Sequence, residues 1–179
     1  MFSSKAGTFF HRSAWQRVLW NSFHHETYYL YTEESGEITG ILPLAHVSSW
    51  LFGSSLTSLP FAVYGGVVSS GLEAASALER EAQSLALRLG VAHLEMRNVT
   101  QRHADWPLQD LYVTFRKELL PTEEGNLLAI PRKQRAMVRK GIKLGLRSAV
   151  DPDSRQFFKL YADNVHRHGT PALPKSYFD

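Results

Sequence analysis

Hydrophobic positions along the chain alternate between helical and strand-like spacing. The helical spacing predicts four helices, at residues 13–23, 73–89, 131–147 and 154–168. Between them, short runs rich in strand-forming residues predict strands at residues 27–32, 37–48, 56–59, 66–69, 91–96, 111–115 and 146–150. Residues 33–36 (EESG) have the composition of a hairpin turn. We therefore expect an α/β (α+β) fold in which helices flank a mixed β-sheet.

The predicted helix at residues 73–89 has the clearest apolar stripe. Five of its residues recur at helical spacing: Ala75, Leu78, Ala82, Leu85 and Leu89. Gly90 follows directly, and glycine at this position ends many helices. We expect this helix to end at Leu89.

The most informative segment is a run of basic residues at positions 130–147 (IPRKQRAMVRKGIKLGLR). It holds seven of the 20 Lys and Arg residues and no Asp or Glu. At helical spacing the cations gather on one side, with Val138 and Ile142 roughly opposite. Pro131 suits the first turn of a helix, and Gly145 suits its end. A helix of this kind is usually directed at phosphate, carboxylate, nucleic acid or an acidic glycan.

Five cations of this helix are candidate anion-binding residues: Arg132, Lys133, Arg135, Arg139 and Lys140. Arg135 and Arg139 are one turn apart, which is a suitable spacing for bidentate contacts to a diphosphate or a carboxylate. Two other interpretations stay open: a charged face that is merely solvated, and an interface for a further domain.

A second candidate site is the segment SLPFAVYGG at residues 58–66. Gly65 and Gly66 would let the backbone approach a ligand closely, while Phe61 and Tyr64 would line a pocket. The alternative is a bend at Pro60 and a glycine turn that the fold itself requires. Both interpretations stay open.

Glu95 and Arg97 fall at the end of the strand predicted at residues 91–96. They are two positions apart and therefore face the same side of the strand. The spacing suggests an internal ion pair as easily as a role for Glu95 as a proton acceptor, and of the two we favour the structural ion pair.

Composition narrows the function classes. The 179 residues carry a net charge of only +3, so the basic run is a local feature. The chain has no cysteine, which excludes disulfides and thiolate chemistry. No run approaches the roughly 18 apolar residues of a membrane span, and the first residues lack the apolar core of a signal peptide. The histidines lack a third ligand at metal-binding spacing, so we expect no metal site. The absence of an apolar span and of a signal peptide leads us to expect no membrane span and a cytoplasmic protein.

The last residues contain two prolines followed by the start of a further element. Residues 169–179 (GTPALPKSYFD) read as a connector, and Tyr177 and Phe178 are unusual residues to leave in solvent. We expect one domain at residues 1–168, a connector at residues 169–179 that leads into a second domain, and a truncated chain.

Several long segments resemble one known family. They are TFFHRSAW (8–15), YLY (29–31), ITGILPLAHVSSWLFG (38–53), SLPFAVYGG (58–66), LEMRN (94–98) and IPRKQRAMVRKGIKLGL (130–146). In these segments the chain resembles the FemAB-related group of GNAT-like acyltransferases, in the branch associated with exosortase/PEP-CTERM exopolysaccharide systems.

The resemblance implies two GNAT-like domains in a full-length member, with this chain covering the first. It implies transfer of an acyl or aminoacyl group from acyl-CoA or aminoacyl-tRNA to an amine acceptor in cell-envelope or exopolysaccharide biosynthesis. The expected share of this domain is recognition of an anionic acceptor, with tRNA as a possible donor partner and no tightly bound cofactor. The isolated chain is expected to be inactive. The alternative is a non-catalytic domain that binds an anionic glycan or nucleic acid through the helix at residues 131–147.

Overall fold

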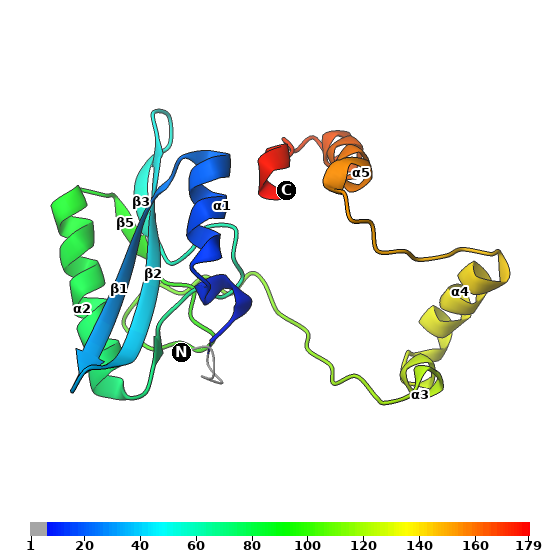
Figure 1. Cartoon of the computed structure of the whole chain (residues 1–179), viewed down its shortest axis with the longest axis horizontal. Helices are drawn as coiled ribbons and strands as arrows, with labels where there is room; N and C mark the ends of the chain where they lie inside the picture. The colour runs from blue at the N-terminus through cyan, green and yellow to red at the C-terminus, as the bar shows by residue number, and fades with distance from the viewer. Residues whose placement is uncertain (1–6) are drawn as a thin grey trace. The chain divides into compact units, whose positions relative to one another are not determined.

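The structure is a computed structural model and describes residues 7–179. These residues form two units (Figure 1). The larger contains the chain up to Trp106 together with Ser154–Asp179, and the smaller contains Pro107–Asp153.

A mixed five-stranded sheet forms the centre of the larger unit. Its strands are β1 (Glu26–Glu34), β2 (Glu37–Ser49), β3 (Gly53–Thr57), β4 (Val68–Ser69) and β5 (His93–Glu95). They run in the order β1-β2-β3-β5, with β4 paired to β2. All neighbours are antiparallel except β3 and β5, which are parallel. The α+β architecture with a mixed sheet flanked by helices is therefore confirmed.

The β1–β2 hairpin is closed by the turn that the sequence predicts. Glu34 pairs with Glu37, so Ser35 and Gly36 form a two-residue loop. Both have positive φ, 52° and 82°, which is the conformation of a type I′ turn. This turn matches the twist of the strands it joins and sets the pairing next to it, at Glu33 and Glu34. Between Thr32 and Glu33 the register shifts, so the rest of the hairpin pairs in a different register.

Helices cover both faces of the sheet. The helical elements of the larger unit are η1 (Phe9–His11), α1 (Ala14–Phe23), α2 (Leu72–Leu89), α5 (Ser154–Arg167) and η2 (Lys175–Tyr177). On one face, Leu42 and Leu44 of β2 pack with the apolar stripe of α2. On the other face, which α1 covers (Figure 1), Ala45 packs with Trp15 and Leu19 of that helix. The sheet therefore separates two apolar clusters.

The helix α2 confirms both the predicted apolar stripe and the predicted end at Leu89. Ala75, Leu78, Ala82 and Leu85 are buried. Gly90 adopts a left-handed conformation at φ 62°, and the N–H of Val91 reaches back to the carbonyl of Ala86 at 3.2 Å. This bond, with Gly90 N to Leu87 O at 3.1 Å, satisfies the last carbonyls of the helix.

The smaller unit contains two helices, α3 (Glu123–Leu128) and α4 (Arg132–Lys143). The Thr122 hydroxyl accepts a hydrogen bond from Gly125 N at 3.1 Å and caps α3. The helix α4 is shorter than the predicted helix at residues 131–147. Pro131 is its N-cap, and Gly145, at φ 77°, ends it as predicted.

Two predicted strands are wrong. Residues 111–115 and 146–150 lie in the smaller unit and form no strand. Their apolar side chains are exposed, with Tyr112 at 88%, Phe115 at 92% and Val150 at 98%. A strand requires a neighbour for its hydrogen-bond ladder, and the residues described in this unit provide none. The predicted strands at residues 56–59, 66–69 and 91–96 are present in part, as β3, β4 and β5.

The C-terminal residues pack within the larger unit. The Tyr177 ring of η2 contacts Trp15 with ring centroids 5.9 Å apart and Phe23 at 5.8 Å. Phe178 contacts Tyr161 of α5 at 4.9 Å. Both aromatic residues therefore have ring partners. No helix within residues 7–179 combines the length and apolar character needed to cross a bilayer.

The packing of α2 predicts a large difference between two leucines on the same helix. Leu78 is 2% exposed and Leu87 is 83% exposed. We expect Leu78→Ala to lower the free energy of unfolding by about 2–5 kcal/mol because it leaves a cavity beside Leu42 and Leu44. Leu87→Ala is the matched control and should change it by less than about 0.5 kcal/mol. Urea denaturation followed by circular dichroism measures both, and equal effects would contradict the packing.

Candidate functional site

The loop at residues 58–66 joins β3 to β4 at the carboxyl ends of the parallel strands β3 and β5. This is the edge at which open α/β sheets bind ligands. Ser58 N donates to the carbonyl of Glu95 at 2.8 Å, and Arg97 N donates to the Ser58 hydroxyl at 2.6 Å. Gly66 N donates to the carbonyl of Arg97 at 3.0 Å. The loop is therefore tied at both ends to the segment that follows β5.

The Arg97 side chain holds the middle of the loop. Its Nε donates to Glu95 Oε1 at 2.6 Å, and its Nη1 donates to the carbonyl of Ala62 at 2.8 Å. The predicted ion pair between Glu95 and Arg97 is confirmed. Because Glu95 accepts from Arg97, its function here is to orient the guanidinium against the loop.

Two residues of the loop have an unusual backbone conformation. Ala62 N donates to the carbonyl of Leu59 at 3.3 Å, which closes a turn with Pro60 in second place and Phe61 in third. Phe61 has φ 62°, in a position where such turns favour glycine. Leu59 also has positive φ, 61°, and is fully buried. Each such residue costs on the order of 1–3 kcal/mol and persists where its surroundings hold it, often at functional sites.

The strained turn presents the Phe61 ring at the surface, 39% exposed. The ring stacks on Phe23 with centroids 4.1 Å apart, and the His25 ring lies parallel at 6.4 Å. Burial lowers the pKa of His25 from its ordinary value, and the nearby His46 lowers it further. The Nε2 atom of His46 is buried and has no hydrogen-bond partner within the part of the chain described. The surface around Phe61 is therefore formed mainly by stacked aromatic rings.

Glycine is required at positions 65 and 66, because nearby atoms of the protein leave no room for a Cβ atom at either position. A Cβ on Gly65 would lie 2.6 Å from the Ser58 carbonyl oxygen, and one on Gly66 would lie 2.1 Å from Asn98 Oδ1. The carbonyl of Tyr64 accepts from the Thr8 hydroxyl at 2.9 Å. The sequence predicted that the backbone at these glycines would approach a ligand closely. In the structure it approaches Ser58 and Asn98 of the same chain.

The helix α4 carries the other predicted site residues, in the smaller unit. Arg132, Lys133, Arg139 and Lys140 are exposed, and none forms an ion pair with a carboxylate of residues 7–179. Arg135 is half-buried, and its Nε donates to the carbonyl of Ile130 at 3.1 Å. The opposite side is also open, with Val138 at 42% and Ile142 at 64% exposure.

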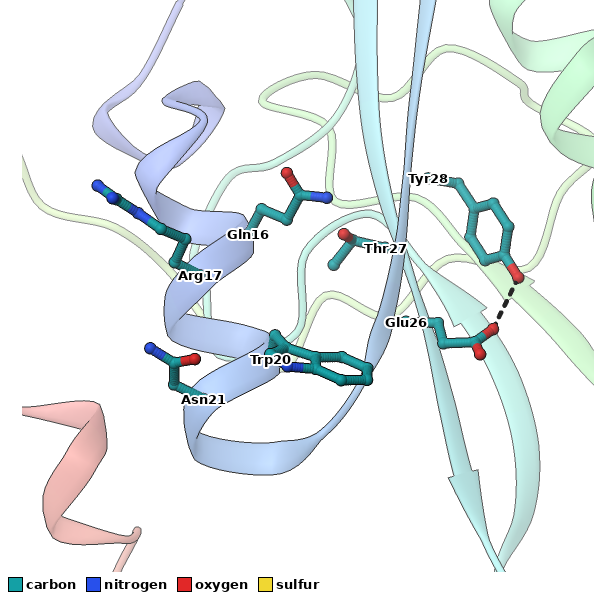
Figure 2. A pocket seen from close by; sticks show the side chains of 7 residues that line it. All are labelled: Gln16, Arg17, Trp20, Asn21, Glu26, Thr27 and Tyr28. Atoms are coloured by element: carbon teal, nitrogen blue, oxygen red, sulfur yellow. Dashed lines mark hydrogen bonds between the residues drawn. The ribbon is translucent and has the colours of Figure 1, made fainter.

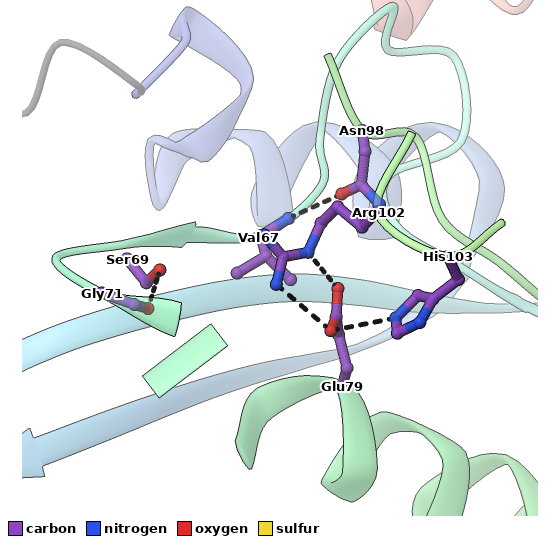
Figure 3. Close-up of polar contacts among 7 residues, drawn as sticks. All are labelled: Val67, Ser69, Gly71, Glu79, Asn98, Arg102 and His103. Atoms are coloured by element: carbon purple, nitrogen blue, oxygen red, sulfur yellow. Dashed lines mark hydrogen bonds and ion pairs between the residues drawn. The ribbon is translucent and has the colours of Figure 1, made fainter. Parts of the chain in front are cut away.

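Sequence reasoning missed a buried carboxylate on α2. Glu79 is 2% exposed and accepts hydrogen bonds from Arg102 Nε and, at 3.1 Å, from His103 Nε2 (Figure 3). The His103 ring stacks on Trp106 at 4.5 Å. These contacts attach the loop after β5 to α2. A signal was present, because position 79 falls on the apolar stripe, four residues after Ala75 and three before Ala82.

Comparison with known proteins found no match to this chain, either among protein-family models or among curated proteins and solved structures. Among the described residues, no group of three or more His, Asp or Glu side chains is placed to hold a metal ion. The site is accordingly defined by its geometry alone.

The contacts of Gly66 make its replacement a test of the loop. Gly66→Ala should lower the free energy of unfolding by about 1–3 kcal/mol, because the added methyl group overlaps Asn98. Gly71→Ala meets no atom within 4 Å and should cost less than about 1 kcal/mol. Thermal and urea denaturation compare the two. If both variants were equally stable, the crowding at Gly66 would be wrong.

The Glu79 cluster predicts a second contrast along α2. Glu79→Ala leaves the Arg102 guanidinium without its buried partner and should destabilise the fold by about 2–4 kcal/mol. Glu81 pairs with Arg88 on the surface at 2.7 Å, with both side chains at least half exposed. Glu81→Ala should therefore change stability by less than about 1 kcal/mol. Urea denaturation at pH 7 measures both, and a small effect at position 79 would show that the cluster contributes little.

Proposed function

We propose that this chain is part of an N-acyltransferase and binds an anionic substrate through α4. The reaction would pass an acyl or aminoacyl group from acyl-CoA or aminoacyl-tRNA to an amine acceptor in cell-envelope or exopolysaccharide biosynthesis. The observation that carries the proposal is the exposed cationic side of α4, which has no carboxylate partner within residues 7–179.

The charge of α4 favours a ligand with several negative groups. Arg132, Lys133, Arg139 and Lys140 lie on one short helix, and their charges repel one another unless an anion lies among them. Arg139 offers a planar guanidinium suited to bidentate contacts with phosphate or carboxylate. The lysines add point charges that strengthen the local field. Phosphates of a nucleotide, a tRNA or a glycosyl carrier all supply this chemistry.

Acyl transfer to an amine makes modest demands on side-chain chemistry. The amine attacks an activated ester or thioester, so the protein mainly orients two substrates, stabilises the oxyanion and accepts a proton. In the larger unit, the surface assigned to substrate is the Phe61 ring, which the chain keeps exposed in a strained turn. Apolar walls of this kind are common in ligand sites.

The same cations favour a second candidate function, which needs no catalysis. A domain that holds an anionic glycan or a nucleic acid through α4 would use the field of its lysines and arginines without a defined reaction site. The two functions differ in how binding depends on individual residues. A substrate site depends strongly on one or two bidentate contacts, whereas polyanion binding loses a similar amount for each cation removed.

The test is a transfer assay with charged tRNA and acetyl-CoA as donors and cell-envelope or exopolysaccharide precursors as acceptors. It uses this chain and any longer natural polypeptide that contains it. We expect transfer by the longer polypeptide, and Arg139→Ala should reduce it by about tenfold or more through loss of a bidentate contact. Arg80→Ala, an exposed arginine on α2, is the matched control and should leave transfer unchanged.

Salt dependence separates the two functions. For a polyanion binder, the logarithm of the binding constant falls linearly with the logarithm of salt concentration, with a slope of about −0.7 per phosphate contact on single strands. Absence of transfer from either donor, together with such a slope for this chain, would overturn the acyltransferase and support the binding domain. Absence of both would overturn the role of α4 in either function.

A further inference from the structure

The turn between β2 and β3 carries three exposed apolar side chains in succession. Trp50 is 99% exposed, Leu51 is 70% exposed and Phe52 is 87% exposed. They form a three-residue loop, because Ser49 pairs with Gly53 across the hairpin. Figure 1 shows this hairpin extending past the ends of α1 and α2 in the same unit. These three residues, the apolar tip, therefore form a convex projection that plays no part in the function proposed above.

The backbone of the apolar tip has hydrogen-bond partners inside the turn. The Ser49 hydroxyl accepts hydrogen bonds from Leu51 N and from Phe52 N, each at 3.3 Å. Gly53, at φ 79°, lets the chain return into β3. A backbone N–H that enters an apolar phase without a partner costs free energy. The bonds to Ser49 lower that cost for two of the three residues.

The hairpin also keeps charged groups away from its tip. Residues 38–72 contain no Asp, Glu, Lys or Arg. On the neighbouring strand β1 the first carboxylate is Glu26, which accepts from the Tyr28 hydroxyl at 3.0 Å (Figure 2). Glu26 pairs with His46, three positions before Ser49, which places it roughly 10 Å from the turn. Amphipathic elements enter a membrane surface by about 5–10 Å, so the tip can reach this depth while Glu26 stays in water.

A lipid surface suits this tip better than a protein partner does. A specific protein interface buries about 800 Å² on each side and has a polar rim with about ten hydrogen bonds, which three apolar side chains on a convex turn do not supply. Tryptophan and other amphipathic aromatic rings are enriched where membranes meet water. We propose that the apolar tip inserts into the surface of a lipid bilayer, among the headgroups and the outer acyl carbons. This inference does not rest on acyl transfer or on α4.

The experiment measures Trp50 fluorescence with vesicles of phosphatidylcholine that contain about one third phosphatidylglycerol. One set of vesicles carries bromine on the acyl chains, which quenches tryptophan by contact. The chain has four tryptophans, and Trp50→Phe identifies the signal of Trp50 because it removes the fluorophore and keeps an apolar ring. We expect the Trp50 emission to move to shorter wavelength and to be quenched by the brominated vesicles at up to about 5 mM lipid.

Variants assign the effect to the tip. Trp50→Phe should lose the quenching and still sediment with vesicles. Leu51→Ser combined with Phe52→Ser should lower the partition constant about tenfold or more, because two apolar side chains are lost from the lipid phase. Both positions are exposed, so the circular dichroism spectrum should not change. Trp20→Phe is the matched control, since Trp20 is 54% exposed on α1 beside β1 (Figure 2), and it should keep both quenching and sedimentation.

Three results would overturn the proposal. The first is the absence of quenching at about 5 mM lipid. The second is a partition constant that the paired serine variant leaves unchanged. The third is vesicle binding that salt abolishes and that leaves Trp50 unquenched, which would assign the binding to the cations of α4.

Other occupants of the tip are recognised without lipid. If the Trp50 emission shifted with protein concentration alone, a second copy of the chain would cover the tip. If it were already shifted in a longer natural polypeptide, a further domain would cover it. Either result would overturn insertion into a bilayer, whereas failure of the acyl-transfer assay has no bearing on it.

Discussion

The larger unit depends on the alternation of side chains along β2. Successive residues of a strand face opposite sides, so Leu42 and Leu44 pack with α2 while Ala45 packs with α1. A shift of one residue in its pairing with β1 would turn the leucines toward α1. The two-residue turn at Ser35 and Gly36 closes the hairpin, and a register shift between Thr32 and Glu33 separates the turn from the pairs that contain the leucines. Both helices, and the three strands β1, β3 and β4 that pair with β2, take their positions from β2.

The loop at residues 58–66 shows how this scaffold supports an unfavourable backbone. The ends of β3 and β5 are joined by hydrogen bonds of Ser58 and Arg97, and the Arg97 side chain holds the Ala62 carbonyl. These bonds, with the burial of Leu59, offset the left-handed conformations of Leu59 and Phe61. The helix α4 is the opposite case, since its cations have no partner within residues 7–179 and its field is directed at solvent.

Local sequence patterns predicted the elements that depend on residues close together in the chain or on a single apolar face. The stripe of α2 and its glycine stop, and the hairpin with its turn, follow from helical spacing and from backbone preferences of single residues. Residues 111–115 have the composition of a strand but no neighbouring strand within the described chain. The strand predicted there from composition was therefore wrong, because a strand also needs a partner. Of the candidate site, the pairing of Glu95 with Arg97 was one of two interpretations that their spacing allowed, and the structure contains this ion pair.

The sequence alone determined the α+β class, the main helices, the hairpin with its turn and the cationic side of α4, because each depends on residues near one another in the chain. Only the tertiary structure decided that Gly66 lies against Asn98, that Glu79 is buried between Arg102 and His103, and that Trp20 lies beside β1. These contacts join residues distant in sequence. Their geometry follows from how the sheet and helices pack, which no local pattern contains.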